Sequence, residues 1–197
     1  MNYSLRKTPR LALLAAVLTM AACSIEKNPQ QTGISADGKI DLIVKGDYVV
    51  SMDGASTVYD NGAVAVDDGL ILAVGPADEI TAQYSAVETL AGENRIVMPG
   101  LINGHSHAAM TLLRGVADDL ALMDWLNNYI FPAEVQFVDS EFVRIGTELA
   151  CWEMIRGGTT SFVDMYYFPD TIAEGVDSCG MRALISATVI DQRSPDA

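Results

Sequence analysis

Hydrophobic and polar positions follow two different patterns along this chain of 197 residues. Between residues 40 and 92, short apolar runs are separated by Gly and Asp turns. Runs of this length, bounded by turn residues, are typical of β-strands. The stretch therefore predicts a small all-β unit, with strands at Leu42–Val44, Tyr48–Val50, Ala63–Val66 and Leu70–Val74.

Beyond residue 95, short apolar runs alternate with longer segments of helical period. Arg95–Met98 reads as a short buried strand, and further strands are expected at Leu101–Asn103, Thr160–Met165 and Arg182–Ile190. Strands that alternate with helices indicate an α/β fold with a parallel sheet and right-handed crossovers.

Two helices are expected between these strands. Asp139 and Ser140 supply the start of the first, and Gly157-Gly158 ends it. The second is expected over residues 169–178, closed by Gly180. In the first helix, apolar residues recur every three or four positions and form one face of the kind that packs on a core; they are Phe142, Ile145, Leu149, Trp152 and Ile155.

The first 22 residues have the pattern of a secretory signal peptide. Three basic residues, Arg6, Lys7 and Arg10, precede an apolar run over residues 11–22. A run of this length is too short to span a bilayer as a helix, which needs about 20 residues.

The tetrapeptide Met20-Ala21-Ala22-Cys23 resembles a bacterial lipobox, in which the cysteine is lipidated and becomes the new N-terminus. Methionine stands where leucine is usual, so ordinary cleavage near the alanines and an uncleaved anchor are the alternatives. Residues 23–39 then read as a flexible tether. We expect a protein exported to the bacterial periplasm or cell envelope and anchored to the membrane by a lipid on Cys23.

The composition of the chain limits the kinds of partner that we expect it to bind. The net charge is −14 and the acidic residues are scattered. Binding to the backbone of nucleic acids needs a basic surface, so we expect no nucleic-acid partner. Half of the residues are hydrophobic, which is typical of a globular protein. Whether the chain forms a homo-oligomer is left open by the sequence.

The chain has two histidines, His105 and His107, which lie two residues apart after an apolar extended run. Alternate residues of a strand point to the same face, so both imidazoles can bind one ion. An isolated His-x-His pair carries a high risk of coincidence. A strand that ends in metal ligands and leads into a helix is, however, the geometry of a (β/α)₈ barrel.

The run from Pro99 to Gly115, which contains both histidines, resembles the first barrel strand and helix of the amidohydrolase superfamily. Within it, the chain is similar to the methylthioadenosine/S-adenosylhomocysteine deaminases and to the triazine hydrolases and chlorohydrolases. The resemblance continues through Phe131–Glu134 and Gly157–Tyr166 and covers about residues 40 to 195. It implies a metal-dependent (β/α)₈ (TIM) barrel that follows a small β-sandwich domain.

The resemblance also implies site residues. His105 and His107 match two metal ligands for one divalent ion, Zn²⁺, and Glu134 matches a glutamate that contacts the substrate. The alternative for Glu134 is a solvated carboxylate near a helix start. Asp164 could point into the mouth of the barrel, but an acidic residue at this place is expected to orient neighbouring backbone.

The implied reaction is hydrolysis of a carbon–nitrogen bond by metal-activated water. The expected substrate is an adenosine-type or other aminated nitrogen heterocycle, whose exocyclic amine leaves as ammonia. A chlorohydrolase or cyclic amidase of the same superfamily is one alternative. A non-catalytic, lipid-anchored binding module is another.

Four segments are expected: a signal peptide at 1–22, a tether at 23–39, part of a β-sandwich domain at 40–96 and part of a barrel at 97–197. A complete barrel needs about 250 residues, and no histidine follows His107. The superfamily's later histidine and its aspartate general base are therefore expected beyond residue 197. Only about three βα units are then present, and we expect the 197-residue chain by itself to be inactive.

Of two further cysteines, Cys151 lies in the first expected helix and Cys179 lies near the end of the second. Buried free thiols are the default for both. An exported protein could pair them, and the sequence leaves this open.

Overall fold

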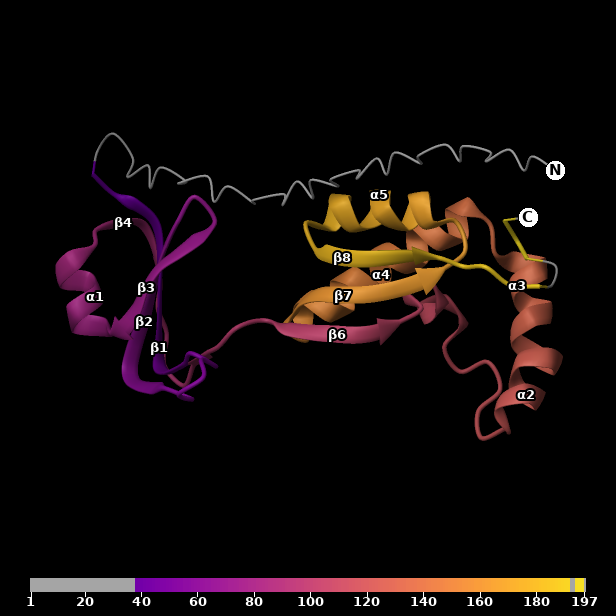
Figure 1. Cartoon of the computed structure of the whole chain (residues 1–197), viewed down its shortest axis with the longest axis horizontal. Helices are drawn as coiled ribbons and strands as arrows, with labels where there is room; N and C mark the ends of the chain where they lie inside the picture. The colour runs from indigo at the N-terminus through magenta and orange to yellow at the C-terminus, as the bar shows by residue number, and fades with distance from the viewer. Residues whose placement is uncertain (1–37, 192–193, 197) are drawn as a thin grey trace, which may run out of the picture.

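The computed structural model describes residues 38–191 and 194–196. The predicted signal peptide and the predicted lipidation site at Cys23 lie outside these residues, as does the predicted tether before residue 38. The described residues form two sheets, which Figure 1 shows toward opposite ends of the molecule. Among the helices described, none is long and apolar enough to cross a membrane.

The first sheet has five strands. Strands β3, β2 and β1 are antiparallel neighbours, and β4 and β5 both pair with β1 in parallel. Strand β1 unites two of the predicted runs in one continuous strand. The bounds are β1 (Ile40–Val50), β2 (Val58–Asp67), β3 (Leu70–Pro76), β4 (Ala86–Leu90) and β5 (Ile96–Val97).

A helix packs on this sheet, which corrects the prediction of an all-β unit. Helix α1 (Ala77–Gln83) follows β3 directly and buries Ala77 and Ile80 in a core with strand residues such as Ile40. Pro76 before the helix and acidic residues in its first turn are start signals that the sequence carries. A helix of seven residues has too few turns for its period to stand out between strands.

The strand expected at Arg95–Met98 is present at its centre, but it belongs to the first sheet and is not buried. Its centre forms β5, which pairs with β1 through Val49 and Val97 and therefore belongs to the first sheet. It is also exposed, since Ile96 keeps 65% of its accessible surface. A short apolar run has no period that could assign it to a sheet or to a core. The predicted domain boundary between residues 96 and 97 consequently falls inside β5.

The second sheet consists of three parallel strands in the order β6 (Leu101–Ser106), β7 (Thr159–Tyr166) and β8 (Arg182–Ala187). Parallel strands joined through helices confirm the predicted α/β class for this part of the chain. Strand β8 ends at Ala187, before the predicted end at Ile190.

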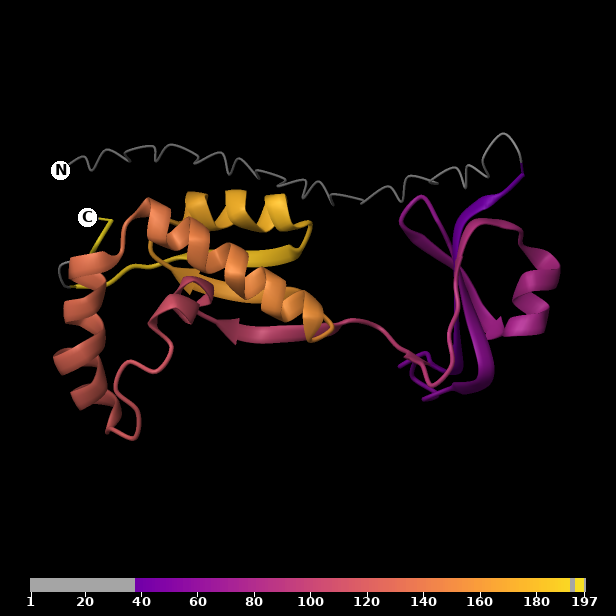
Figure 2. The same ribbon diagram turned by 180° about the vertical axis from the view of Figure 1, so that it is seen from behind.

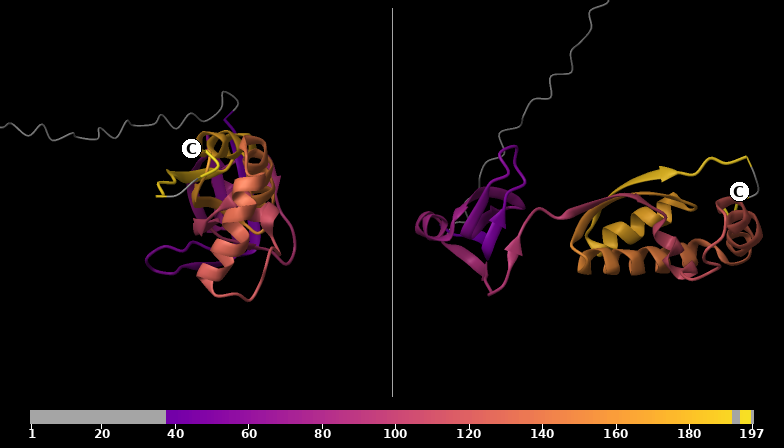
Figure 3. Two further views of the ribbon diagram at one scale, coloured as in Figure 1. Left: turned by 90° about the vertical axis from the view of Figure 1, so that its right-hand side faces the viewer. Right: turned by 90° about the horizontal axis from the view of Figure 1, so that it is seen from below.

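Several helices connect these strands, and α4 and α5 cover one face of the sheet (Figures 2 and 3). The predicted end signals are confirmed. The Asp139 carboxylate accepts a hydrogen bond from the Phe142 N–H at 2.8 Å, and Gly180 ends α5 with a φ of 71°. The bounds are η1 (Ala108–Leu113), α2 (Leu122–Trp125), η2 (Leu126–Ile130), α3 (Phe131–Phe137), α4 (Ser140–Arg156) and α5 (Pro169–Cys179).

Helix α4 does not bury the apolar face that its sequence predicts. Ile145, Trp152 and Ile155 are exposed, and the Arg156 guanidinium lies 5.0 Å from the centre of the Trp152 ring. Small side chains let η1 and α5 approach α4 closely, so close packing rather than the size of the apolar residues selects the buried face. That face consists of Val143, Gly146, Thr147, Ala150 and Cys151.

Gly146 allows η1 to lie against α4. A Cβ at this position would collide with the Ala109 carbonyl oxygen and lie 2.8 Å from the Ala109 Cα, which are backbone atoms. We expect Gly146→Ala to lower the free energy of unfolding by about 2–3 kcal/mol, although alanine favours a helix by about 1 kcal/mol. Urea unfolding measures this, with Gly75→Ala as the control, because its Cβ would have no neighbour closer than 3.7 Å. Equal midpoints for the two variants would contradict the close packing.

Candidate active site

The two predicted metal ligands lie at the C-terminal end of β6, with His105 inside the strand and His107 directly after it. Their ring centres are 5.1 Å apart and the ring planes are inclined at 78°. Two imidazoles that bind one tetrahedral zinc at about 2.0–2.1 Å have centres roughly 5 Å apart. The separation of these two rings therefore fits a shared ion.

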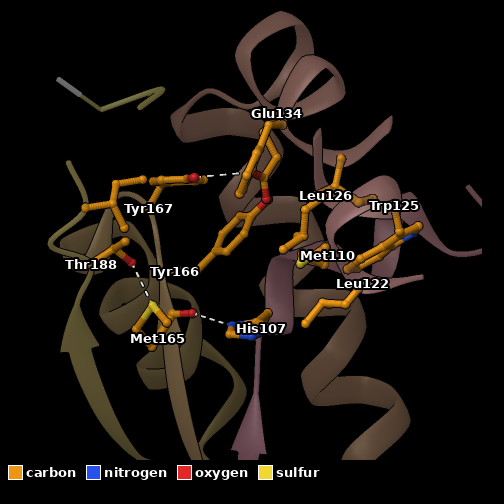
Figure 4. A pocket seen from close by; sticks show the side chains of 13 residues that line it. His107, Met110, Leu122, Trp125, Leu126, Glu134, Met165, Tyr166, Tyr167 and Thr188 are labelled. Carbon is orange, nitrogen blue, oxygen red and sulfur yellow. Dashed lines mark hydrogen bonds between the residues drawn. The ribbon is translucent and has the colours of Figure 1, made fainter. Parts of the chain in front are cut away.

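A hydrogen bond orients His107. Its Nδ1 lies 2.7 Å from the main-chain carbonyl oxygen of Met165 in β7, as Figure 4 shows. A carbonyl oxygen accepts but does not donate, so Nδ1 carries the proton, and in the neutral imidazole Nε2 keeps its lone pair. Histidines that bind metals are commonly held by such a second hydrogen bond. His107 thus has the tautomer that a metal ligand needs.

Asp164 supports the backbone around His107. Its Oδ1 accepts one hydrogen bond from the Ser106 hydroxyl at 2.8 Å and another from the Ala108 N–H at 2.9 Å. The side chain keeps only 1% of its accessible surface. These hydrogen bonds confirm that Asp164 orients neighbouring backbone. They give no support to the alternative that its side chain points into the mouth of a barrel.

Glu134 lies in the first turn of α3 and is 4% exposed, which contradicts the alternative of a solvated carboxylate. Its Oε1 accepts a hydrogen bond from the Tyr166 hydroxyl at 2.9 Å, and its Oε2 accepts one from the Tyr167 hydroxyl at 3.2 Å. Burial raises the pKa of Glu134 above its usual range, although the two hydroxyls and His107 act to lower it. Burial and this carboxylate also raise the pKa of both tyrosines.

His107 and Glu134 line the same pocket, which has a volume of about 300 Å³ (Figure 4). His105 lies beside His107 but is not part of this lining. Most of the wall is apolar, which is typical of sites for small organic molecules. The other lining residues are Met110, Leu122, Trp125, Leu126, Ile130, Phe131, Met165, Tyr166, Tyr167, Thr188 and Ile190.

Sequence reasoning missed the roles of several of these residues. Tyr166 and Tyr167 follow Asp164 at the end of β7, and the end of a barrel strand is the place where functional side chains are expected. The sequence carried no comparable signal for Trp125, because the helix in which it lies has only four residues. In the structure, the Trp125 Nε1–H donates a hydrogen bond to the Val116 carbonyl oxygen at 3.1 Å. In the part of the chain that the structure describes, no group of three or more His, Cys, Asp or Glu side chains is placed to hold a metal.

Comparison with protein families matches residues 96–197 to the Amidohydrolase family. This range is more than half of the chain. The chain belongs to the amidohydrolase family. A second, shorter match covers residues 62–84 and corresponds to the imidazolonepropionase-like composite domain of bacteria. The resemblance that the sequence motifs indicated is thereby confirmed.

Curated relatives of this amidohydrolase include adenosine-type deaminases. It is 48% identical over 157 residues to the 5-methylthioadenosine/S-adenosylhomocysteine deaminase of Syntrophobacter fumaroxidans, an alignment that covers 80% of this chain and 36% of the relative. It is 45% identical over 151 residues to the 5'-deoxyadenosine deaminase of Methanosarcina mazei, covering 77% and 34%. The chain therefore spans about a third of the length of the curated relatives it matches.

Solved structures agree with this assignment. An adenosine deaminase from Xanthomonas campestris with bound zinc superimposes with a TM-score of 0.77 at 42% identity, covering 81% of this amidohydrolase and 36% of that chain. An atrazine chlorohydrolase from Arthrobacter aurescens, complexed with zinc, superimposes with a TM-score of 0.65 at 20% identity, covering 74% and 35%. The second likeness shows the shared fold alone.

The buried carboxylate of Glu134 should make the stability of this amidohydrolase depend on pH. Because its pKa in the folded protein lies above the usual 4.5, the folded state keeps a proton that the unfolded chain has released. The contribution of Glu134 to the free energy of unfolding therefore falls as pH rises through the window above 4.5. In the variant Glu134→Gln, this part of the decrease in the free energy of unfolding with rising pH should be absent.

Urea unfolding over a range from about pH 4 to about pH 8 measures the effect as the difference between the protein and the variant. The exposed Glu174 on α5 supplies the control, and Glu174→Gln should leave the pH dependence unchanged. The assignment fails if Glu134→Gln and the unchanged protein have parallel stability curves.

Proposed function

We propose that this chain supplies the metal-binding start of a zinc-dependent deaminase, which removes the exocyclic amine of an adenosine-type nucleoside as ammonia. The observation that carries the proposal is the joint placement of His107, with Nε2 open, and the buried Glu134 in one pocket. Two relatives, named as a 5-methylthioadenosine/S-adenosylhomocysteine deaminase and a 5'-deoxyadenosine deaminase, are 48% and 45% identical and support the substrate class.

The proposed fold of the whole catalytic unit is a (β/α)₈ barrel, of which β6, β7 and β8 with their helices are the first three βα units. The parallel order of these strands and the position of the histidines at a strand end support this. The sheet face opposite α4 and α5, where Ile102 and Leu184 are exposed, would line the barrel interior. The five-stranded sheet would be part of a β-sandwich domain.

His105 and His107 are the residues that would hold the zinc ion. Zinc supplies a water that is activated for attack near neutral pH. The Met165 carbonyl keeps the His107 Nδ1 protonated, so Nε2 stays available as a ligand. The later histidine ligand and the aspartate general base that the resemblance to the superfamily implies remain predictions.

Glu134 would bind the substrate. Each carboxylate oxygen has two lone pairs, and each accepts one hydrogen bond from a tyrosine, so one acceptor site on each oxygen is left for a donor of the substrate. The apolar side chains of Leu122, Trp125 and Leu126 line the same pocket and would contact the uncharged ring.

The experiment that tests this function measures ammonia released by the zinc-loaded product of the complete gene. Adenosine, 5-methylthioadenosine and S-adenosylhomocysteine are the expected substrates. A chlorotriazine and a cyclic amide test the first alternative, since they would release chloride or open a ring instead. No turnover of any of these compounds would favour the non-catalytic binding module.

Glu134→Gln is expected to reduce kcat/KM for the best nucleoside by about 10–100-fold, mainly through KM, because hydrogen bonds to a charged group contribute about 1.5–3 kcal/mol. The pocket keeps its shape in this variant, since glutamine still accepts from a tyrosine hydroxyl. Glu174→Gln is again the matched control, with unchanged kinetics. An unchanged KM in Glu134→Gln would show that Glu134 does not bind the substrate.

Export and lipid anchoring also stay part of the proposal, with the bacterial periplasm or cell envelope as the location. The supporting pattern is the basic and apolar leader that ends at Cys23. Growth with a labelled fatty acid should label the protein, and Cys23→Ala should abolish the label. Absence of label from the unchanged protein would contradict the anchor.

A further inference from the structure

Cys151 and Cys179 lie on the two helices that cover the second sheet. Both are free cysteines; Cys151 is fully buried in α4, and Cys179 is the half-buried last residue of α5. Cys179 packs against the core cluster that contains Cys151, and the two thiols are near enough for Cys179 to raise the pKa of Cys151. None of the roles described above uses either residue.

The two helices are close enough for a covalent link. Both lie in connections between parallel strands, so the chain runs in the same direction along α4 and α5. Four residues before the cysteines, a Cβ placed on Gly175 would lie 3.3 Å from the Cβ of Thr147. Disulfide-bonded cysteines have Cβ atoms about 3.5–4.5 Å apart. One helical turn further on, Cys151 and Cys179 occupy the equivalent positions.

We propose that Cys151 and Cys179 form a disulfide that fastens α5 to α4 when the protein meets an oxidising disulfide compound. The packing of Cys179 against the cluster that contains Cys151, and the close approach of the two helices one turn earlier, carry this proposal. It is independent of the proposed deaminase activity.

Oxidised glutathione suffices as the oxidant. The thiolate of the accessible Cys179 attacks one glutathione sulfur, which forms a mixed disulfide and releases one glutathione thiolate. The Cys151 thiolate then attacks the Cys179 Sγ, which forms the protein disulfide and releases the second glutathione thiolate. Two protein thiols are oxidised, the glutathione disulfide is reduced to two thiols, and these thiols take up the two protons that the cysteines lose.

The second step should be slow and should accelerate as pH rises. Burial, together with the contact to Cys179, raises the pKa of the Cys151 thiol to about 12, so its thiolate is scarce near neutral pH. Asp164 also acts to raise this pKa, which means that the cross-link would lie near the carboxylate that supports His107.

Tryptic mapping after incubation of the native protein with oxidised glutathione tests the proposal. The protein is produced without the leader, residues 1–22, so that Cys23 is not lipidated and stays a free thiol. Trypsin cleaves after Arg144, Arg156 and Arg182, so each cysteine of the pair lies on its own peptide, 145–156 and 157–182, and Cys23 lies on a third peptide that ends at Lys27. Once the free thiols are alkylated, one linked species that joins the first two peptides is expected, and reduction should dissociate it. The intact protein should lose the mass of two hydrogen atoms.

Variants separate the two steps. Cys151→Ser should stop at a stable glutathione adduct on Cys179, whereas Cys179→Ser should acquire no adduct at the buried Cys151. In guanidinium chloride, where the helices no longer hold the pair together, Cys23 should pair as readily as the other two. The oxidised native protein should also unfold at a higher temperature than the reduced one, an increase that Cys151→Ser lacks.

Two results would overturn the proposal. One is a persistent glutathione adduct on Cys179 of the unchanged protein without the linked peptides, at high as well as neutral pH. The other is native cross-linking of Cys23 to either partner in amounts equal to the pair between α4 and α5.

Discussion

His107→Ala is expected to lower ammonia release by the zinc-loaded product of the complete gene by about 1,000-fold or more, since the metal supplies several kcal/mol of transition-state stabilisation. The reason is the loss of the imidazole that the Met165 carbonyl holds with its Nε2 available. Zinc content, measured on the same sample, should fall with activity. At saturating added zinc, part of the activity should return if the defect is metal affinity.

Ser106→Ala is the matched control for this variant. Ser106 lies between the two histidines, and its hydroxyl lies 2.8 Å from both the Asp164 carboxylate and the Val163 carbonyl oxygen, which share its single proton. Its loss removes hydrogen bonds without removing a metal ligand, so activity should stay within about tenfold of the unchanged protein. Full zinc content and full activity in His107→Ala would exclude His107 as a ligand and would remove the main support for the proposed function.

Asp164→Ala is expected to lower the free energy of unfolding by about 1–3 kcal/mol, because removal of this buried acceptor leaves a buried donor unpaired. That donor is the Ala108 N–H directly after His107, whereas the Ser106 hydroxyl can still donate to the Val163 carbonyl oxygen. Urea unfolding measures the loss. Asp170→Ala, which removes an exposed aspartate from the first turn of α5, should cost less than about 1 kcal/mol.

The same substitution should also affect the site. Without the carboxylate, the Ala108 N–H directly after His107 loses its hydrogen bond to β7. Zinc affinity should then fall by about 10–100-fold, the usual effect of losing a residue that orients a metal ligand. Asp164→Asn keeps one acceptor oxygen, so its stability and its zinc affinity should lie between those of the unchanged protein and those of Asp164→Ala. A stable Asp164→Ala protein with unchanged zinc affinity would show that the backbone around His107 does not need this anchor.

Local sequence was sufficient for the features that depend on neighbouring residues. The cap at Asp139 and the glycine at the end of α5 were predicted correctly, because a helix end is decided within a few residues. The shared face of His105 and His107 follows from the period of a strand. The α/β class of the second sheet follows from the alternation of periods in the sequence.

Other features were beyond the sequence, because they depend on residues that are distant in the chain. The small residues of α4, and not its larger apolar stripe, face the core because η1 and α5 need a close approach at Gly146 and Thr147. The assignment of β5 to the first sheet was decided by its pairing with β1. In both cases periodicity identified an element or an apolar run but could not say which partner it meets.

For the candidate site, the sequence by itself determined the types of residue and the tertiary structure decided their states. His107 and Glu134 could be named as candidates, but the tautomer of His107 depends on a carbonyl 58 positions away and the burial of Glu134 on hydroxyls 32 and 33 positions away. Hydrogen bonds and desolvation act through space, so they set protonation and orientation only after the chain has folded.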